Sequence, residues 1–132
     1  MIFNVNIVLD NPVVRLQIPP LVKGDTFQLN VTLLLESGQD ITNWKIRAAI
    51  YDFINSLRLA SANTGGSDEQ ILVTNGSQGQ FTVTVAENLT TYFRDRGNIE
   101  VSVETDELVP RKFTILKQRL RFLEEKITWD TP

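Results

Sequence analysis

The amino-acid sequence predicts an all-β fold, an antiparallel sandwich of about seven or eight strands with one short helical crossing. Apolar residues alternate with polar residues over many short segments, which is the period of a strand with one buried face. Turn-forming residues separate these segments, and only one segment has helical spacing. At 132 residues the chain is long enough for one hydrophobic core and too short for two ordinary domains.

The clearest pattern lies in residues 23–52, which predict two strands, either as a hairpin or as a pair that crosses between sheets. Apolar residues of period two run from Phe27 to Leu35 and again from Trp44 to Ile50. Each set is expected on one buried face, with Trp44 in the core. Residues 36–40 between them have turn chemistry, because glycine adopts positive φ and Ser and Asp bond to nearby backbone.

Residues 1–22 are predicted to be either the first strand of the sandwich or an arm that docks on a neighbouring subunit. Residues 3–9 alternate poorly and indicate an edge strand, and residues 13–18 offer a second short strand. Pro19 and Pro20 stop any ladder, because proline has no N–H to donate, and they also suit a stiff hinge. The predicted organisation is a strand or arm at residues 1–22, a β-sandwich at 23–123 and a C-terminal tail at 124–132.

The second half of the chain supplies the remaining elements. Residues 87–96 are the helix-like segment, in which Leu89, Tyr92 and Phe93 would share one buried face and Gly97 would end the helix. Residues 53–62 have no clean period, residues 63–69 are expected to be a solvated loop, and Asn75-Gly76 predicts a tight hairpin turn. Further strands are predicted at residues 71–73, 81–85, 99–103, 113–115 and 120–122.

The composition excludes several function classes. The chain has no cysteine and no histidine, which removes disulfides, thiolate metal sites and the usual general base at neutral pH. No nucleotide-binding glycine pattern is present, and no pair of acidic residues stands out as a glycosidase pair. We therefore expect no enzyme activity, no cofactor and no metal. Without a signal peptide or an apolar run of membrane length, a soluble protein made in a cytoplasm is expected.

Charge is spread unevenly along the chain, although the formal total is only −3. Residues 111–132 hold six basic and three acidic residues, whereas residues 1–110 hold seven and thirteen. On a strand, Lys117, Arg119 and Arg121 share one face. A solvated sheet face is favoured over nucleic-acid binding. A third interpretation is that this cationic strand and the acidic remainder steer neighbouring copies together.

Three short motifs at strand entries and within a strand carry a resemblance to a known family. Lys-Gly-Asp-Thr-Phe at residues 23–27 and Asp-Ile-Thr-Asn-Trp-Lys-Ile-Arg at residues 40–47 each lead into a strand, and a Phe-x-Val-x-Val strand follows at 81–85. The pattern resembles the immunoglobulin-like β-sandwich domains of tailed-phage virion proteins, among them the N-terminal domains of lactococcal-phage baseplate upper proteins. Ile41 and Asn43 stand where that pattern has Leu and Gly.

The resemblance implies a non-enzymatic virion structural protein, assembled in the host cytoplasm. A capsid decoration or cement protein is expected first, because the chain is short, begins with Met1 and carries no second receptor-binding or trimerisation domain. A baseplate or tail attachment protein and a carbohydrate-binding module are the alternatives. Expected partners are phage capsid or tail proteins and further copies of the chain, with no membrane and no nucleic acid. Candidate partner-binding residues are Phe3, Val5, Pro19, Pro20, Arg119, Arg121, Ile127 and Trp129.

Overall fold

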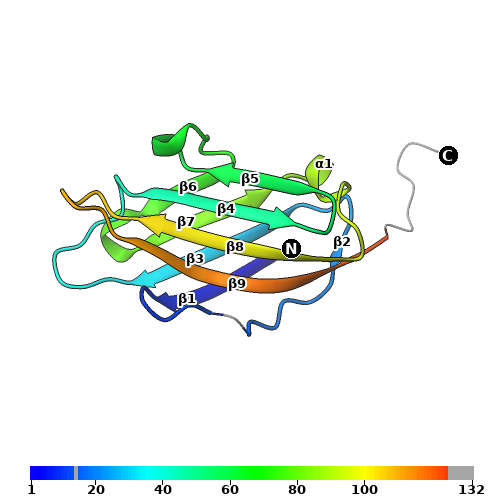
Figure 1. Ribbon diagram of the computed structural model, residues 1–132, viewed down its shortest axis with the longest axis horizontal. Helices are drawn as coiled ribbons and strands as arrows, with labels where there is room; N and C mark the ends of the chain where they lie inside the picture. The colour runs from blue at the N-terminus through cyan, green and yellow to red at the C-terminus, as the bar shows by residue number, and fades with distance from the viewer. Residues whose placement is uncertain (14, 125–132) are drawn as a thin grey trace.

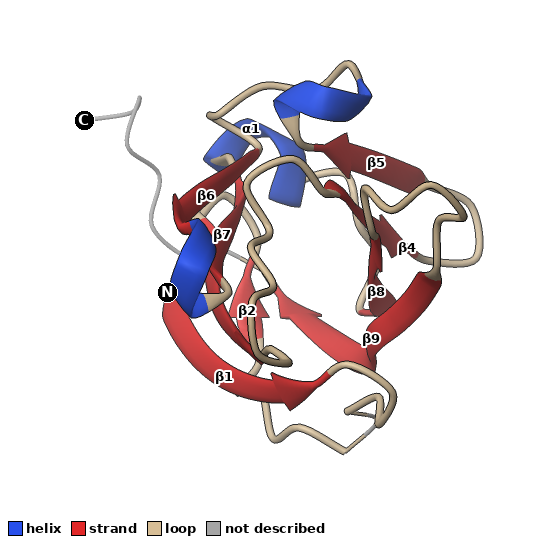
Figure 2. Cartoon of the chain, turned by 90° about the vertical axis from the view of Figure 1, so that its left-hand side faces the viewer, coloured by secondary structure: helices blue, strands red, loops and turns tan. Residues whose placement is uncertain are grey.

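A computed structural model describes residues 1–13 and 15–124, and these form two facing β-sheets (Figures 1 and 2). One short helix, α1 (Glu87–Thr90), accompanies them, so the predicted all-β sandwich is confirmed. The first sheet contains, in spatial order, β1 (Ile2–Val8), β3 (Phe27–Leu34), β7 (Gln80–Val85) and β6 (Ile71–Asn75). The second contains, in spatial order, β2 (Leu21–Val22), β9 (Lys112–Leu123), β8 (Arg96–Glu104), β4 (Lys45–Tyr51) and β5 (Ser56–Ala60).

The strand order is that of an immunoglobulin domain. The β1-β3-β7-β6 sheet corresponds to an ABED sheet, and β9-β8-β4 corresponds to GFC, with β5 added at the edge. Two pairings depart from an all-antiparallel sandwich. The short β2 runs parallel to β9, and β1 runs parallel to β3 over its whole length, from the Ile2–Gln28 pair to the Val8–Leu34 pair. The N-terminal strand therefore forms the outer edge of the four-stranded sheet.

Period-two alternation produces the core as the sequence predicts. The inward residues of β3 are at most 2% exposed, and Trp44, Ile46 and Ile50 are equally buried before and within β4. Because β3 and β4 lie in different sheets, this central pair crosses between sheets and does not form a hairpin. The two sheets thus contribute facing layers to a single core, in which the rings of Phe93 and Phe122 stack with centroids 5.2 Å apart.

The second short strand expected at residues 13–18 is not present as predicted. Val13 forms an isolated bridge to Leu116, and regular pairing with β9 resumes only in β2. Between them, Pro19 and Pro20 are exposed and lie outside any strand. The loss of two N–H donors explains why the ladder starts after the prolines. Residue 14 is outside the described part of the chain.

Three local predictions are wrong. The helix occupies only residues 87–90 of the expected 87–96, and Gly97 is a buried residue of β8 instead of a helix terminator. Tyr92 is 66% exposed, so it does not join the core with Phe93. Asn75-Gly76 does not form a two-residue hairpin turn, because a 3-10 helix at Gly76–Gln78 connects β6 to β7. α1 does connect β7 to β8 and so crosses between the sheets.

A β-bulge sets the faces of the longest strand. The β8–β9 register shifts between Val101 and Ser102, which leaves both Ile115 and Leu116 buried. An extra residue in one strand reverses which side chains point outward beyond it. Consequently Lys117, Arg119 and Arg121 all lie on the solvent face of the five-stranded sheet. In the described part of the chain, no helix is long and apolar enough to cross a membrane.

Candidate protein-docking surfaces

The outer face of the five-stranded sheet is strongly basic. It carries eight of the thirteen basic residues of the chain but only two of the sixteen acidic residues, Glu100 and Glu104. The remainder of the chain therefore holds five basic and fourteen acidic residues. The basic residues of this face, all exposed, are Lys45, Arg47, Arg58, Arg96, Lys112, Lys117, Arg119 and Arg121.

The four-stranded sheet has the opposite character, because none of the residues in β1, β3, β6 and β7 is charged. Its outward side chains are amides, hydroxyls and a few aliphatic groups. Four aliphatic side chains on this face are exposed by 39% to 66%. We call this surface the uncharged face. Its outward residues are Ile2, Asn4, Asn6, Val8, Gln28, Asn30, Thr32, Leu34, Leu72, Gln80, Thr82 and Thr84.

Side-chain amides on the uncharged face bond to one another, both along β3 and across to β1. Gln28 Nε2 donates to Asn30 Oδ1 at 2.8 Å, and Asn30 Nδ2 donates to Asn4 Oδ1 at 2.9 Å. The Asn4–Asn30 contact joins β1 to β3 at directly paired positions. Amides held this way lose less side-chain entropy on docking than free ones. The uncharged face is thus a partly ordered polar surface.

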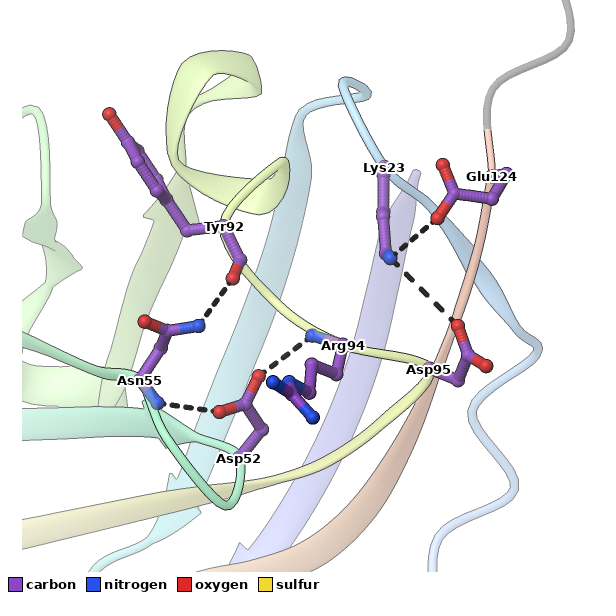
Figure 3. A network of polar contacts seen from close by, with 7 residues as sticks. All are labelled: Lys23, Asp52, Asn55, Tyr92, Arg94, Asp95 and Glu124. Atoms are coloured by element: carbon purple, nitrogen blue, oxygen red, sulfur yellow. Dashed lines mark hydrogen bonds and ion pairs between the residues drawn. The ribbon is translucent and has the colours of Figure 1, made fainter.

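Two loops at one end of the sandwich form a hydrogen-bonded tip around Asp52, at the β4–β5 turn (Figure 3). The Asp52 carboxylate accepts backbone N–H bonds from Ile54 at 2.8 Å and Asn55 at 2.6 Å within its own turn. It also accepts the backbone N–H of Arg94 at 2.7 Å, from the loop that leads into β8. The Asn55 side chain completes the link by donating to the carbonyl of Tyr92 at 2.6 Å.

These bonds determine the charge of Asp52. Partial desolvation acts to raise the pKa of the carboxyl group. Hydrogen bonds from the backbone of Asn55, Arg94 and Ile54, together with the Asn55 side chain, outweigh it and lower the pKa from 3.8 to about 2. Hydrogen bonds to the ionised form favour that form. Asp52 therefore stays ionised at neutral pH, and its carboxylate joins the β4–β5 turn to the loop before β8.

The tip displays apolar side chains to solvent. Phe53 is 97% exposed and Ile54 is 59% exposed, and Tyr92 lies on the adjoining loop at 66%. Figure 3 shows the Tyr92 ring directed away from the Asp52 hydrogen bonds. Large apolar groups held on an ordered turn are typical of anchor residues at protein interfaces.

A second polar contact ties the same end of the sandwich together. Lys23 Nζ lies 2.8 Å from Glu124 and 3.9 Å from Asp95 (Figure 3). The contact links the loop after β2, the end of β9 and the loop before β8. The Lys23 side chain is only 14% exposed, whereas both acidic side chains are open to solvent. Because ion pairs with exposed partners add little stability, the Lys23 contacts mainly orient these three segments relative to one another.

The structure separates the residues that the sequence proposed for partner binding. Arg119 and Arg121 are exposed on the basic face, and Pro19 and Pro20 are exposed beside it. Phe3 is half-buried against the core. Val5 is 7% exposed, because strand alternation turns it inward, so it is not a surface residue of this chain. Ile127 and Trp129 lie outside the described residues. These candidates do not form one site.

Other surface residues had no clear signal in the sequence. Phe53 and Ile54 belong to an apolar segment without a period, which conceals that they form an exposed turn. Asp52 does belong to a known turn pattern, in which an Asp side chain accepts the backbone N–H groups of the residues two and three positions later. Here these residues are Ile54 and Asn55. Which basic residue of the next strand lies beside Arg121 can be known only from the β8–β9 register, which pairs it with Arg96.

The described residues contain no cluster of three or more acidic side chains that could hold a metal ion. They also contain no buried side-chain nitrogen or oxygen without a hydrogen-bond partner. Trp44 is 2% exposed and does not offer a sugar a stacking surface. The outstanding surfaces are therefore the two sheet faces and the tip.

Comparison with known proteins identifies the fold. Neither protein-family models nor curated proteins give a match to this sequence. Among solved structures, the chain is similar to the N-terminal domain of phage TP901-1 ORF48, with a TM-score of 0.53 and 13% sequence identity. The alignment covers 96% of this chain and 100% of that domain. The likeness is one of fold, and it extends over nearly the whole chain.

Proposed function

We propose that this chain is a non-enzymatic structural protein of a tailed-phage virion, which docks on other tail or baseplate proteins. The observation that carries the proposal is the fold similarity, over nearly the whole chain, to a domain of a phage baseplate protein. One fold can serve many functions, because function resides in the surfaces and sites that the fold carries.

The uncharged face also supports the proposal. Charged residues are depleted at the centres of protein interfaces, and this face has none on four strands. At the usual strand spacing and rise, four strands of about seven residues cover roughly 450 Å². A stable interface buries about 800 Å² on each partner. A second contact surface would extend attachment through this face, and the exposed apolar residues of the tip are available.

Within the proposal, a tail or baseplate position takes precedence over capsid decoration. The similar domain comes from a baseplate protein, which supports the tail. Capsid decoration, the first expectation from the sequence, gains no support from this similarity. A sugar-binding role gains no stacking platform from Trp44, which is buried as the sequence predicts. Protein docking is the function that fold and surfaces support together.

The test is to locate the protein in particles. Mass spectrometry and antibody labelling of purified tailed particles, prepared from the source of this sequence, should find the protein at a fixed copy ratio. Label at the tail tip would support a baseplate position. Label over the head at lattice stoichiometry would favour decoration instead. Absence from washed particles would overturn the proposal.

A charge inserted into the uncharged face tests the docking mode. Thr82→Lys places a cation at the centre of that face, and we expect the variant to be lost from particles because desolvating an unpaired charge is costly. Ser102→Lys makes a similar change on the basic face and is the matched control. Both positions are outward on central strands, so both variants should fold. Equal incorporation of the two variants would exclude the uncharged face from docking.

A further inference from the structure

We propose that three arginines at one end of the basic face form a docking pocket for an acidic and apolar segment of a partner virion protein. This inference rests on the proposed function and specifies one of its contacts. Arg96 on β8 and Arg119 and Arg121 on β9 line one surface depression. Tyr51 and Asn98 contribute polar groups to the same depression. We call it the arginine pocket.

The register concentrates positive charge in the arginine pocket. Arg96 lies directly opposite Arg121, and Arg119 projects from the same face two residues away. Like charges opposite each other destabilise a sheet. In residues 1–13 and 15–124 none of the three forms an ion pair. Their charges therefore remain available to a ligand.

The other end of the basic face is different, because acidic residues sit among its cations. Glu100 pairs with Lys117 across β8 and β9, and Glu104 lies between Lys45 and Lys112. Alternating charges of this kind offset one another at short range. Among the strands that the structure describes, only the arginine pocket presents several adjacent cations with no acidic neighbour in register.

Asp52 also lines the arginine pocket, but it does not neutralise it by direct contact. Its two carboxylate oxygens accept backbone N–H groups of its own turn and of Arg94. Figure 3 shows this carboxylate directed toward those loops. The pocket and the tip thus share Phe53, which is 97% exposed and lines the pocket wall.

The occupant follows from this mixture of charge and apolar surface. Guanidinium forks match carboxylates and phosphates equally well in geometry. A long polyanion crossing the sheet would meet Glu100 and Glu104 in the next rows, which disfavours nucleic acid. The apolar walls from Ile18 and Phe53 favour a ligand with aliphatic side chains. A short protein segment that alternates Asp or Glu with Leu or Val satisfies both requirements.

The experiment measures binding of a labelled peptide to the full chain by fluorescence anisotropy at physiological salt. The probe is an eight-residue peptide that alternates Glu and Leu, compared with its Gln-Leu analogue and an oligonucleotide of equal charge. We expect the Glu-Leu peptide to bind most tightly. Arg121→Gln should weaken it about tenfold, since charge-assisted bidentate contacts are strong. Lys112→Gln is the control, with the same charge change on the same face, and should change affinity less than about twofold.

Three outcomes would overturn the arginine pocket. Equal weakening by both variants would mean diffuse electrostatic attraction, and tighter binding of the oligonucleotide would mean a nucleic-acid surface. Self-association of the wild type that Arg121→Gln abolishes would make the occupant a second copy. Thermal unfolding verifies that both variants fold.

Incorporation into particles distinguishes this inference from the proposed function. If the wild type and Arg121→Gln both enter particles equally, the pocket is not a docking contact, while the virion role stands. If the wild type is absent from particles, the virion role fails whatever the peptide result. Loss of Arg121→Gln alone, with Lys112→Gln retained, supports both.

Discussion

The carboxylate of Asp52 accepts the backbone N–H of Arg94 at 2.7 Å, although 42 residues separate them in the chain. This one contact joins the β4–β5 turn to the loop before β8. With the bonds to Ile54 and Asn55, it determines how the exposed Phe53 is presented. Together with the bond from the Asn55 side chain to the Tyr92 carbonyl, the Asp52 carboxylate holds the two loops of the tip together.

Replacement of Asp52 should loosen the tip. We expect Asp52→Ala to lower the free energy of unfolding by about 1 kcal/mol, comparable to loss of a helix cap, because three backbone N–H groups lose their acceptor. Asp68→Ala is the matched control, since Asp68 is an exposed loop residue of the same charge. Chemical denaturation measures both variants, and amide NMR shifts of residues 54, 55 and 94 report the tip. Equal small effects would show that Asp52 does not organise it.

The low pKa of Asp52 gives the same contact a pH dependence. A carboxyl group with a lowered pKa stabilises the fold above its unfolded value of 3.8, and this stabilisation is lost as pH falls toward about 2. The stability difference between the wild type and Asp52→Ala should therefore be constant above about pH 5 and narrow between about pH 4 and pH 2. Urea denaturation across this range measures it. A difference that persists unchanged at the acid end of the range would contradict the assigned pKa.

Regular strands could be predicted because alternation is a local property. The inner residues of β3, β4 and β8 repeat at period two over long stretches, and all of them are buried. β5 could not be predicted in this way. It has only Leu57 and Leu59 as inward apolar residues, and the exposed Phe53 and Ile54 just before it break the pattern.

The candidate surfaces were predictable only in part for a similar reason. Arg119 and Arg121 could be placed on one exposed face from strand period alone, and the structure places them there. Their neighbour Arg96 comes from a different strand, and a register cannot be deduced from one strand's composition. The sequence predicts Val5 as a partner-binding residue, but it is buried. An apolar residue in an edge strand can face the core of its own domain as readily as a partner.

Trp44 provides a test of the core. The side chain is 2% exposed, so Trp44→Ala should lower the free energy of unfolding by about 3–5 kcal/mol. Tyr92→Ala removes another large aromatic group, but at 66% exposure its loss should cost less than about 0.5 kcal/mol. Thermal or chemical denaturation compares the two. A cost below about 1 kcal/mol for Trp44 would place it at the surface and restore it as a candidate sugar platform.

Substitution of Gly97 tests whether this residue occupies a buried strand position, as in the structure, or a helix terminus, as the sequence predicts. A Cβ at this position would lie 2.8 Å from the carbonyl oxygen of Tyr51 and 3.2 Å from the Phe122 ring. Gly97→Ala should therefore destabilise the protein by about 1–3 kcal/mol through overpacking. At a solvent-exposed helix terminus the effect would instead arise from positive φ, but Gly97 is not among the positive-φ glycines. Ser102→Ala on the same strand is the control and should be nearly neutral.

Substitutions in β1 can distinguish the two predicted roles of residues 1–22, a strand of the sandwich and a docking arm. Ile7 is 1% exposed and Ile2 is 66% exposed, on opposite sides of β1. If β1 stays in its own sheet in solution, Ile7→Ala should cost about 2–5 kcal/mol, because it leaves a cavity, whereas Ile2→Ala should cost less than about 0.5 kcal/mol. A free docking arm predicts equally small effects from both substitutions. The comparison uses one chemical change at two sites of one strand, so strand propensity cancels and burial alone determines the result. Since β1 pairs with β3 along its whole length, we expect the asymmetric outcome.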